Sequence, residues 1–133
     1  MTPEIKPYKH LLDIRPGDID LLGHVNNVVY LRWVNEAAEA HWSWLSTPEE
    51  RKSIAWVVLR HEIDYRHPAK PGDTVYAQTW VGETEGVRST RHVQIFREPA
   101  ILLAEAKTTW VLVDASTQRP KRIGPEVLLI LGR

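Results

Sequence analysis

One segment, residues 27–45, restricts the fold more than any other, because it is the only long stretch with a helical pattern. It contains neither glycine nor proline. Four apolar residues recur at helical spacing on one face: Leu31, Val34, Ala38 and Leu45. Asn26 or Asn27 can cap its start, since a short amide side chain accepts hydrogen bonds from the N–H groups of a first turn. The sequence therefore predicts one helix of about 27 Å over these residues.

The remainder of the chain is typical of β-strands. Over residues 57–66, apolar or aromatic side chains alternate with charged ones, which is the period-two pattern of a half-buried strand. The side chains predicted to face inward are Val57, Leu59, His61, Ile63 and Tyr65. Turn-forming segments separate four further predicted strands, at residues 8–15, 74–81, 87–97 and 101–113.

The resulting element order, β-α-β-β-β-β, restricts the architecture. Short connections favour antiparallel neighbours, and such a sheet has one apolar face that must be covered. The predicted helix is the only element long enough to cover it. We therefore expect an α+β fold in which a five-stranded antiparallel sheet wraps around one central helix. Because a single sheet leaves its edge strands open, we expect a second copy at an edge, in a homodimer.

Composition excludes several classes of protein. The chain of 133 residues is 43% hydrophobic and 26% charged, which suits one globular domain over residues 1–133. No cysteine is present, so disulfides, thiolate nucleophiles and cysteine zinc sites are excluded. The 17 basic residues balance the 17 acidic ones, which gives no electrostatic reason to expect nucleic acid. Without a membrane-spanning run or an export signal, we expect a cytoplasmic protein with no membrane insertion.

Polar residues concentrate in segment 18–30, between the first predicted strand and the helix. Asp18, Asp20, Gly23 and His24 are all common in loops, and on composition alone their interpretation as turn and cap residues is favoured. Two features indicate chemistry instead. Asp20 and His24 can both transfer protons, and they precede a helix N-terminus whose unpaired N–H groups can stabilise an oxyanion.

Acyl transfer from a thioester needs a base or a nucleophile beside such N–H donors. None of the serines lies in a Gly-x-Ser-x-Gly elbow, and no cysteine is available. A carboxylate together with helix-terminal amides is sufficient for this chemistry, so Asp20 is the leading candidate. Asp18 is interpreted as a residue that structures the loop or orients His24 or the backbone.

The same segment contains the run Asp18-x-Asp20-x-x-Gly23-His24-Val25-Asn26-Asn27-x-x-Tyr30-Leu31-x-Trp33. This run resembles the signature of the 4-hydroxybenzoyl-CoA thioesterase group of hot-dog-fold proteins, which includes bacterial acyl-CoA thioesterases and the related acyl-ACP thioesterases. Two later segments, at residues 65–73 and 119–123, also resemble that group, so the resemblance covers nearly the whole chain. It implies a hot-dog fold, a dimer or a dimer of dimers with the active site at the subunit interface, and hydrolysis of an acyl-CoA or acyl-ACP.

The resemblance also implies roles for individual residues. Asp20 matches the catalytic carboxylate, which acts as a nucleophile or as a general base on water. Asn27 matches the residue at the helix start whose backbone N–H polarises the thioester carbonyl. His24 matches a position that belongs to the catalytic set in one branch of the family. Asn26 and Tyr30, from the same motif, are candidates for substrate binding.

Charged residues elsewhere are weaker candidates. Arg88 and Arg91 can meet the phosphates of CoA, although for each one taken singly a solvated surface charge is the favoured interpretation. Glu36 and Glu39, on the predicted helix, are interpreted as structural or pocket-lining, and His61 as a packed, hydrogen-bonded histidine. No pair of histidines has the spacing of metal ligands, so we expect neither a metal nor a cofactor.

Three functions compete on these grounds. Hydrolysis of an acyl thioester leads, because Asp20 precedes a helix N-terminus within the family motif. The alternative from another class is a module that binds acyl thioesters without cleaving them. A less favoured alternative is hydration of an enoyl thioester, with His24 as the base.

Overall fold

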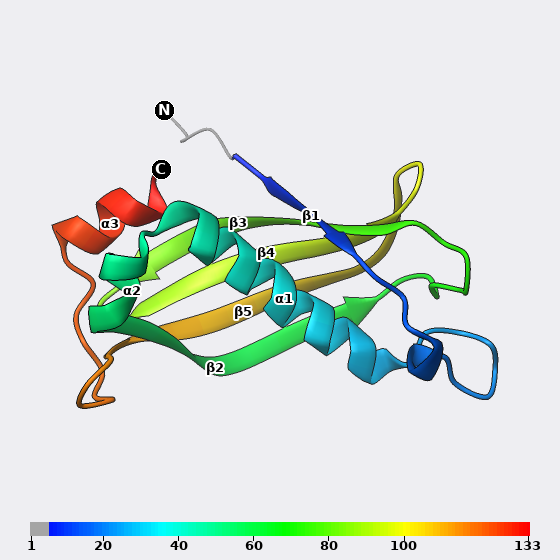
Figure 1. The fold of residues 1–133 in the computed structure, drawn as a ribbon, viewed down its shortest axis with the longest axis horizontal. Helices are drawn as coiled ribbons and strands as arrows, with labels where there is room; N and C mark the ends of the chain where they lie inside the picture. Colours follow the sequence, from blue (N-terminus) through cyan, green and yellow to red (C-terminus); the bar gives the residue numbers. More distant parts are fainter. Residues whose placement is uncertain (1–5) are drawn as a thin grey trace.

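The computed structural model describes residues 6–133 (Figure 1). Its strands are β1 (Tyr8–Leu12), β2 (Ile54–Tyr65), β3 (Val75–Glu85), β4 (Arg88–Arg97) and β5 (Ile101–Asp114). Its helices are α1 (Asn27–Leu45), α2 (Pro48–Ser53) and α3 (Pro125–Leu131), with a short 3-10 helix η1 (Pro16–Asp18) after β1.

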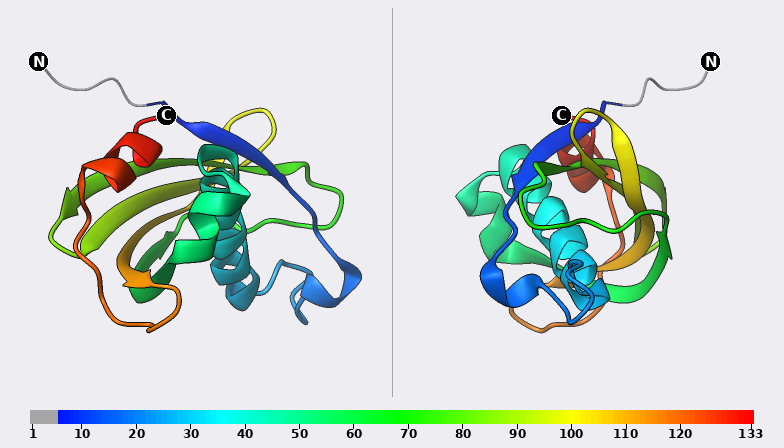
Figure 2. Two further views of the ribbon diagram at one scale, coloured as in Figure 1. Left: turned by 60° about the vertical axis from the view of Figure 1, so that its left-hand side comes forward. Right: turned by 90° about the vertical axis from the view of Figure 1, so that its right-hand side faces the viewer.

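All neighbouring strands are antiparallel, in the order β1-β3-β4-β5-β2, so β1 and β2 form the two edges of the sheet. The sheet curves around α1, which lies against its concave face (Figure 2). This is the predicted α+β architecture. The predicted bounds of the helix are confirmed, and the predicted strands differ from the observed ones only at their ends.

The cap and the buried face of α1 explain its position. Asn26 is the N-cap, and its side chain accepts a hydrogen bond from the Val28 N–H. The face against the sheet consists of Val29, Tyr30, Trp33, Val34, Ala37, Ala38, His41 and Leu45. Leu31, predicted on that face, is 36% exposed. The prediction was wrong for this residue because the buried face is centred on Tyr30, Ala37 and His41. At about 100° per residue, Leu31 lies a quarter-turn from that centre, at the margin of the face.

The strand pattern of β2 is interrupted by a bulge. Its pairing with β5 shifts register between Val58 and Arg60. A bulge adds one residue to one strand and reverses the alternation of its side chains beyond that point. Val57 and Leu59, predicted to face inward, are therefore 52% and 53% exposed. His61 and Ile63, beyond the bulge, are half-buried as predicted.

Two helices were not predicted, although both carry local signals. The α2 helix begins with a capping box in which Thr47 and Glu50 exchange side-chain and backbone hydrogen bonds, with Pro48 in the first turn. The α3 helix also has proline in its first turn, at Pro125. Both helices are too short for helical periodicity to be recognised in the sequence.

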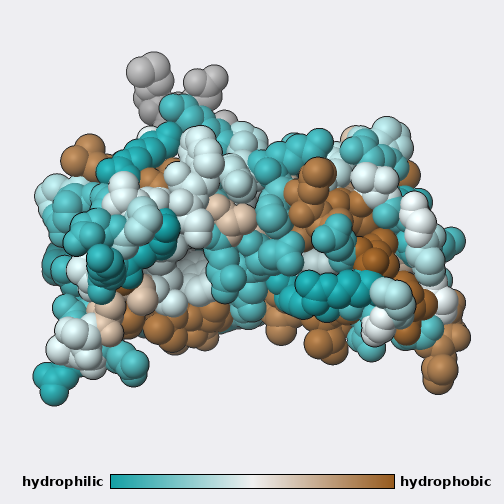
Figure 3. Space-filling view, in the orientation of Figure 1, coloured by the Kyte–Doolittle hydropathy of each residue, from teal (hydrophilic) through white to brown (hydrophobic). Residues whose placement is uncertain are grey.

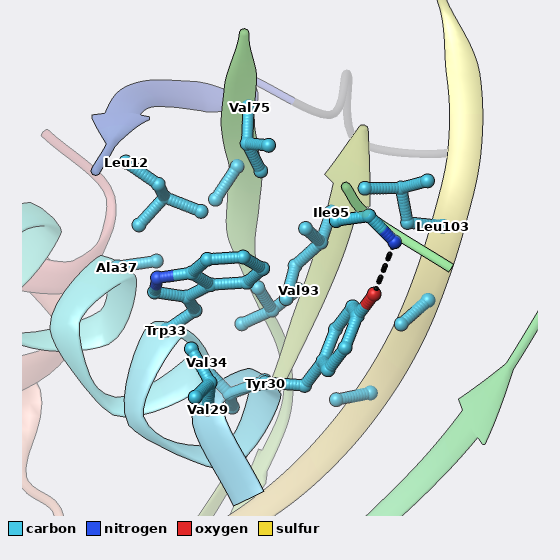
Figure 4. Packing of buried hydrophobic residues seen from close by; sticks show 14 of the residues in the cluster. Leu12, Val29, Tyr30, Trp33, Val34, Ala37, Val75, Val93, Ile95 and Leu103 are labelled. Atoms are coloured by element: carbon cyan, nitrogen blue, oxygen red, sulfur yellow. Dashed lines mark hydrogen bonds between the residues drawn. The ribbon is translucent and has the colours of Figure 1, made fainter. Parts of the chain in front are cut away.

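Two separate hydrophobic clusters fill the space between α1 and the sheet. The first lies under the N-terminal half of α1, where Tyr30 and Trp33 pack on β3, β4 and β5 (Figure 4). The Tyr30 hydroxyl there accepts a hydrogen bond from the Ala69 N–H, at 2.8 Å. The second lies under the C-terminal end of α1 and α3, and consists of Leu45, Ile54, Leu112, Val127 and Ile130.

Between the two clusters lies a row of buried polar side chains, which we call the polar row: His41, Thr79, Arg91 and Thr108. His41 on α1 and Thr108 on β5 lie between members of the first and the second cluster. Thr79 on β3 and Arg91 on β4 lie next to members of the first cluster. His61 from β2 extends the row, since its Nδ1 lies 2.8 Å from the Thr108 Oγ1. The polar row therefore divides the interior into two halves. The packed half lies under the N-terminal half of α1, and the second half lies under its C-terminal half.

No helix within residues 6–133 combines the length and the apolar composition needed to cross a membrane.

Candidate active site

The loop between η1 and α1 is held in one conformation by backbone hydrogen bonds. Ile19 and Val25 form an antiparallel bridge, and the Asp20 N–H donates to the His24 carbonyl at 2.8 Å. Gly23, at the tip, has φ of +78°, which favours glycine because a side chain would strain this backbone. These contacts fold Asp20 back towards the start of α1.

The Asp20 carboxylate uses only one of its oxygens to hold this loop. Its Oδ1 accepts from the Leu22 N–H at 2.9 Å and from the His24 N–H at 3.2 Å. Within the described residues, Oδ2 accepts no hydrogen bond. Asp20 is half-buried. One oxygen therefore orients the side chain and leaves the other available to a water molecule or a substrate.

Asp18 anchors the same loop. It is 4% exposed and forms two parallel hydrogen bonds with the Arg32 guanidinium, at 2.8 and 2.9 Å. It also accepts from the Arg15 N–H at 2.8 Å, while its carbonyl accepts from the Asn26 N–H. The Arg32 hydrogen bonds hold the pKa of the Asp18 carboxyl below its usual value. The interpretation of Asp18 as a residue that structures the loop agrees with these contacts.

The start of α1 offers a free amide. Asn26 accepts from the Val28 N–H at 3.2 Å, and its carbonyl accepts from the Val29 N–H. The Asn27 N–H has no acceptor within residues 6–133. Asn27 is exposed. An unpaired N–H group at the positive end of a nineteen-residue helix is suited to stabilise a developing oxyanion.

The other motif residues differ in accessibility. His24 is half-buried, and its side chain makes no hydrogen bond within the described part of the chain. Tyr30 is 2% exposed and packs edge-on against Trp33 and Tyr65. Its hydroxyl accepts the hydrogen bond from the Ala69 N–H. Within one chain Tyr30 therefore packs in the core, and its paired hydroxyl is not available to a substrate.

Arg88 and Arg91 lie away from the loop. Both lie in the first half of β4. The loop lies towards the other end of that strand, where Arg97 contacts Asp73 and the nearby Ala69 N–H donates to Tyr30 in α1. Arg88 is exposed. Arg91 is 6% exposed, so its interpretation as a solvated surface charge was wrong. The structure does not bring either arginine to Asp20 within one chain.

Arg91 instead lines a cavity beneath the C-terminal half of α1. The cavity has a volume of about 280 Å³ and is walled mainly by apolar and aromatic side chains, including Trp42, Trp56 and Trp110. Glu39 lies at its margin, as the interpretation of that residue as pocket-lining predicted. Glu36 contacts His10 instead, with Nε2 and Oε2 2.9 Å apart.

A family model described as the thioesterase-like superfamily matches residues 14–131. The chain belongs to this superfamily. The match includes the loop, all of α1 and the strands that line the cavity. The family predicted from the sequence motif is confirmed.

Relatives of this thioesterase-like protein agree in length with it. It is 29% identical over 114 residues to the long-chain acyl-CoA thioesterase FadM of Escherichia coli (strain K12), covering 81% of this chain and 84% of the relative. It is 24% identical over 115 residues to the putative acyl-CoA thioesterase YneP of Bacillus subtilis (strain 168), covering 84% and 83%. The crystal structure of the probable thioesterase YbaW from Escherichia coli matches with a TM-score of 0.79 and 25% identity, covering 94% of this chain and 98% of that chain. The predicted hot-dog fold is confirmed.

Proposed function

We propose that this thioesterase-like protein hydrolyses acyl-CoA, with Asp20 as the catalytic carboxylate and the Asn27 N–H as the oxyanion donor. The observation that carries the proposal is the free Asn27 amide beside a loop that leaves one Asp20 oxygen unused. The names of FadM and YneP, both acyl-CoA thioesterases, support the choice of substrate class.

In the proposed reaction, the Asp20 carboxylate takes a proton from a water molecule as the water oxygen bonds to the thioester carbon. The carbonyl oxygen gains negative charge and accepts a hydrogen bond from the Asn27 N–H. The carbon–sulfur bond then breaks, and the proton passes to the departing thiolate, which leaves a free acid and CoA. General-base catalysis contributes about 10²–10⁴-fold and one oxyanion donor about 10²–10³-fold. Direct attack by the carboxylate would displace the thiolate and form a mixed anhydride with Asp20, and a water molecule would then hydrolyse this anhydride to give the same products.

We infer that two copies of the chain pair through β2. This strand is an edge of the sheet, and it exposes Val57, Leu59 and Tyr65. Figure 3 shows hydrophobic surface along the lower margin of the view, where Figure 1 places β2. An unpaired edge with exposed apolar side chains favours antiparallel pairing with a second copy about a two-fold axis.

Such a dimer would bring the helix start of one copy to the cavity of the other. The Tyr65 hydroxyl, at the end of β2, donates to the Asn27 carbonyl at 3.4 Å, so that end of β2 lies beside the start of α1. Ile54 and Trp56, at the beginning of β2, line the cavity. Antiparallel pairing places the end of one strand beside the beginning of the other. The proposed active site is therefore shared between subunits.

The test is the release of free thiol from a panel of acyl-CoA substrates by the wild type and by Asp20→Asn. Asparagine keeps an acceptor for the Leu22 and His24 N–H groups, so the loop is preserved while the base is removed. We expect kcat to fall by about 10²–10⁴-fold. Equal rates in the two proteins would move the base to another residue, such as His24. Acyl-CoA binding without turnover by the wild type would favour a non-catalytic module, and hydration of crotonyl-CoA would favour a hydratase.

A further inference from the structure

Arg91 is held in the interior without an anionic partner. Its Nη1 donates to the His41 Nδ1 at 2.7 Å and to the Thr79 Oγ1 at 3.0 Å. Within residues 6–133, no carboxylate lies within 4 Å of its guanidinium. A buried cation without a carboxylate or a full set of acceptors is unfavourable, and proteins rarely retain one without a use.

The partners of Arg91 orient it but do not neutralise it. Burial and the neighbouring arginine lower the pKa of His41 to about 4, so the ring is neutral at pH 7 and its Nδ1 accepts. The Thr79 hydroxyl donates to the His92 carbonyl at 2.8 Å and so accepts from Arg91. Both contacts use Nη1. The remaining guanidinium N–H groups have no acceptor in the described part of the chain.

The cavity adjoins this guanidinium, since Arg91 is one of its lining residues. The surrounding walls are mainly apolar and aromatic, from Ile54, Trp42 and Trp56. Arg51 and Ser89 also line the cavity, and the Arg51 Nη1 donates to the Ser46 carbonyl at 2.6 Å. The acid at the margin is Glu39, which is exposed to solvent. A ligand that fits these walls is apolar along its length and ends in an acceptor of hydrogen bonds.

We propose that the cavity receives an acyl group whose far end carries a carboxylate, and that Arg91 binds this carboxylate. This inference rests on the proposed thioesterase function and names its substrate class, the CoA thioesters of dicarboxylic acids. The cavity of about 280 Å³ is close to the lower end of the volumes at which proteins bind small molecules. A medium-length chain with a terminal carboxylate has this size. Arginine suits the task because its planar fork binds both carboxylate oxygens.

The arrangement explains why a charge is maintained inside an apolar chamber. With a carboxylate bound, the charge is paired in surroundings of low polarity, where a hydrogen bond to a charged group contributes more than one between neutral groups. A substrate with a methyl group at that position would leave the guanidinium unpaired and would be bound less well.

The experiment compares adipyl-CoA with hexanoyl-CoA, which have equal numbers of carbon atoms in the acyl group and differ in the terminal carboxylate. Binding is measured by titration calorimetry with Asp20→Asn protein, in which turnover is slow. Hydrolysis is measured as kcat/KM with protein that retains Asp20. We expect adipyl-CoA to be favoured by about 10- to 100-fold in both measurements, as for one charged hydrogen-bonded contact.

Substitutions assign the preference to Arg91. Arg91→Leu should remove the preference and favour hexanoyl-CoA, and Arg91→Lys, which keeps a charge, should retain part of it. Arg97→Leu is the matched control, because Arg97 lies on the same strand, contacts Asp73 and does not line the cavity. This control should leave the ratio between the two substrates unchanged. Arg91→Lys keeps the test valid if Arg91→Leu does not fold.

Failure of the inference and failure of the function are distinguishable. Hydrolysis of both substrates without a preference for adipyl-CoA, or a preference that survives Arg91→Leu, would overturn the inference and leave the thioesterase function intact. Tighter binding of adipyl-CoA without hydrolysis would support the carboxylate site and overturn the function. Absence of both binding and hydrolysis would overturn both.

Discussion

The two halves of α1 face interiors of different kinds. Under the first half, Tyr30 and Trp33 are packed without a cavity of the kind found further along, and the Tyr30 hydroxyl is paired with the Ala69 N–H. Under the second half, Arg91 and Trp110 line a chamber, and the Arg91 guanidinium retains N–H groups without an acceptor within residues 6–133. The chemistry proposed for this protein follows the same division. The packed half carries Asp20 and the free Asn27 amide at its end, while the open half offers the room for an acyl group.

This division has a physical reason. An oxyanion donor must be held within a few tenths of an ångström of its acceptor, which requires a rigid support. The first half of α1 provides that support through dense packing and through the Asp18–Arg32 pair. Space for a substrate requires looser packing, and the polar row keeps the two hydrophobic clusters from merging into one continuous core. One helix thus serves both purposes at different points along its length.

After Asp20→Asn, the largest expected effect comes from removing the amide at the packed end. Asn27→Pro deletes the N–H group but is compatible with the first position of a helix, and Asn26 has φ of −62° and ψ of 140°, which a following proline permits. We expect kcat for acyl-CoA hydrolysis to fall by about 10²–10³-fold. Asn27→Ala is the control, since it retains the N–H. Equal rates for the two variants would place the oxyanion donor elsewhere.

A smaller change in activity should follow from mixing a chain altered at the packed half with a chain altered at the open half. If the shared site is correct, Asp20→Asn and Arg91→Leu chains, each weakly active on adipyl-CoA, form heterodimers with one intact site. After unfolding and refolding as an equal mixture, activity should recover to about a quarter of the wild type, since half of the dimers are mixed and each has one intact site. No recovery, with heterodimers confirmed by native mass spectrometry, would place both residues in sites within one chain.

Stability should distinguish the two halves in a third way. Tyr30→Phe leaves the buried Ala69 N–H without its acceptor, so the free energy of unfolding should fall by about 1–3 kcal/mol. Tyr76→Phe is the control, because the Tyr76 hydroxyl makes only a long contact of 3.5 Å with the Pro99 carbonyl. Chemical denaturation of both variants provides the measurement. A similar loss in each would mean that the Ala69 contact contributes little.

The smallest expected effect concerns pH and the polar row. The pKa of His41, about 4, is below the value of about 6.5 expected in the unfolded chain. The unfolded state therefore binds more protons between these values, and the stability present above pH 6.5 declines as pH falls towards 4. Between pH 7 and pH 5 we expect a loss of about 1–2 kcal/mol from this residue. His41→Asn keeps an acceptor for Arg91, so its stability should depend less on pH over this range.

The elements with strong local signals were predictable from the sequence. Residues 27–45 contain no helix breaker and follow an amide cap, and the helix has those bounds. The alternation along β2 was predicted only in part, because the bulge between Val58 and Arg60 is produced by pairing with β5, which no local pattern records. The two short helices were predictable in principle from Thr47-Pro48 and Gly124-Pro125.

The candidate site was likewise predictable from the sequence only in part. The motif from Asp18 to Asn27 is local, so its loop and helix start could be read from neighbouring residues. The burial of Arg91 depends on His41, fifty positions away in the chain, and on Thr79 from another strand. Such a contact arises only when the sheet closes on the helix. An arginine among charged neighbours in sequence is ordinarily exposed, and for this reason its place in the interior was not predicted.

The ion pair between Asp18 and Arg32 fastens the loop to the helix and not to the sheet. The loop and the helix start are therefore joined as one unit, while Arg91 and Trp110, which line the chamber, belong to strands of the sheet. A lineage descended from such a protein can exchange Arg91 or Trp110 and acquire a new acyl preference without altering the reaction. The reaction then stays the same while the acyl group that the protein accepts changes.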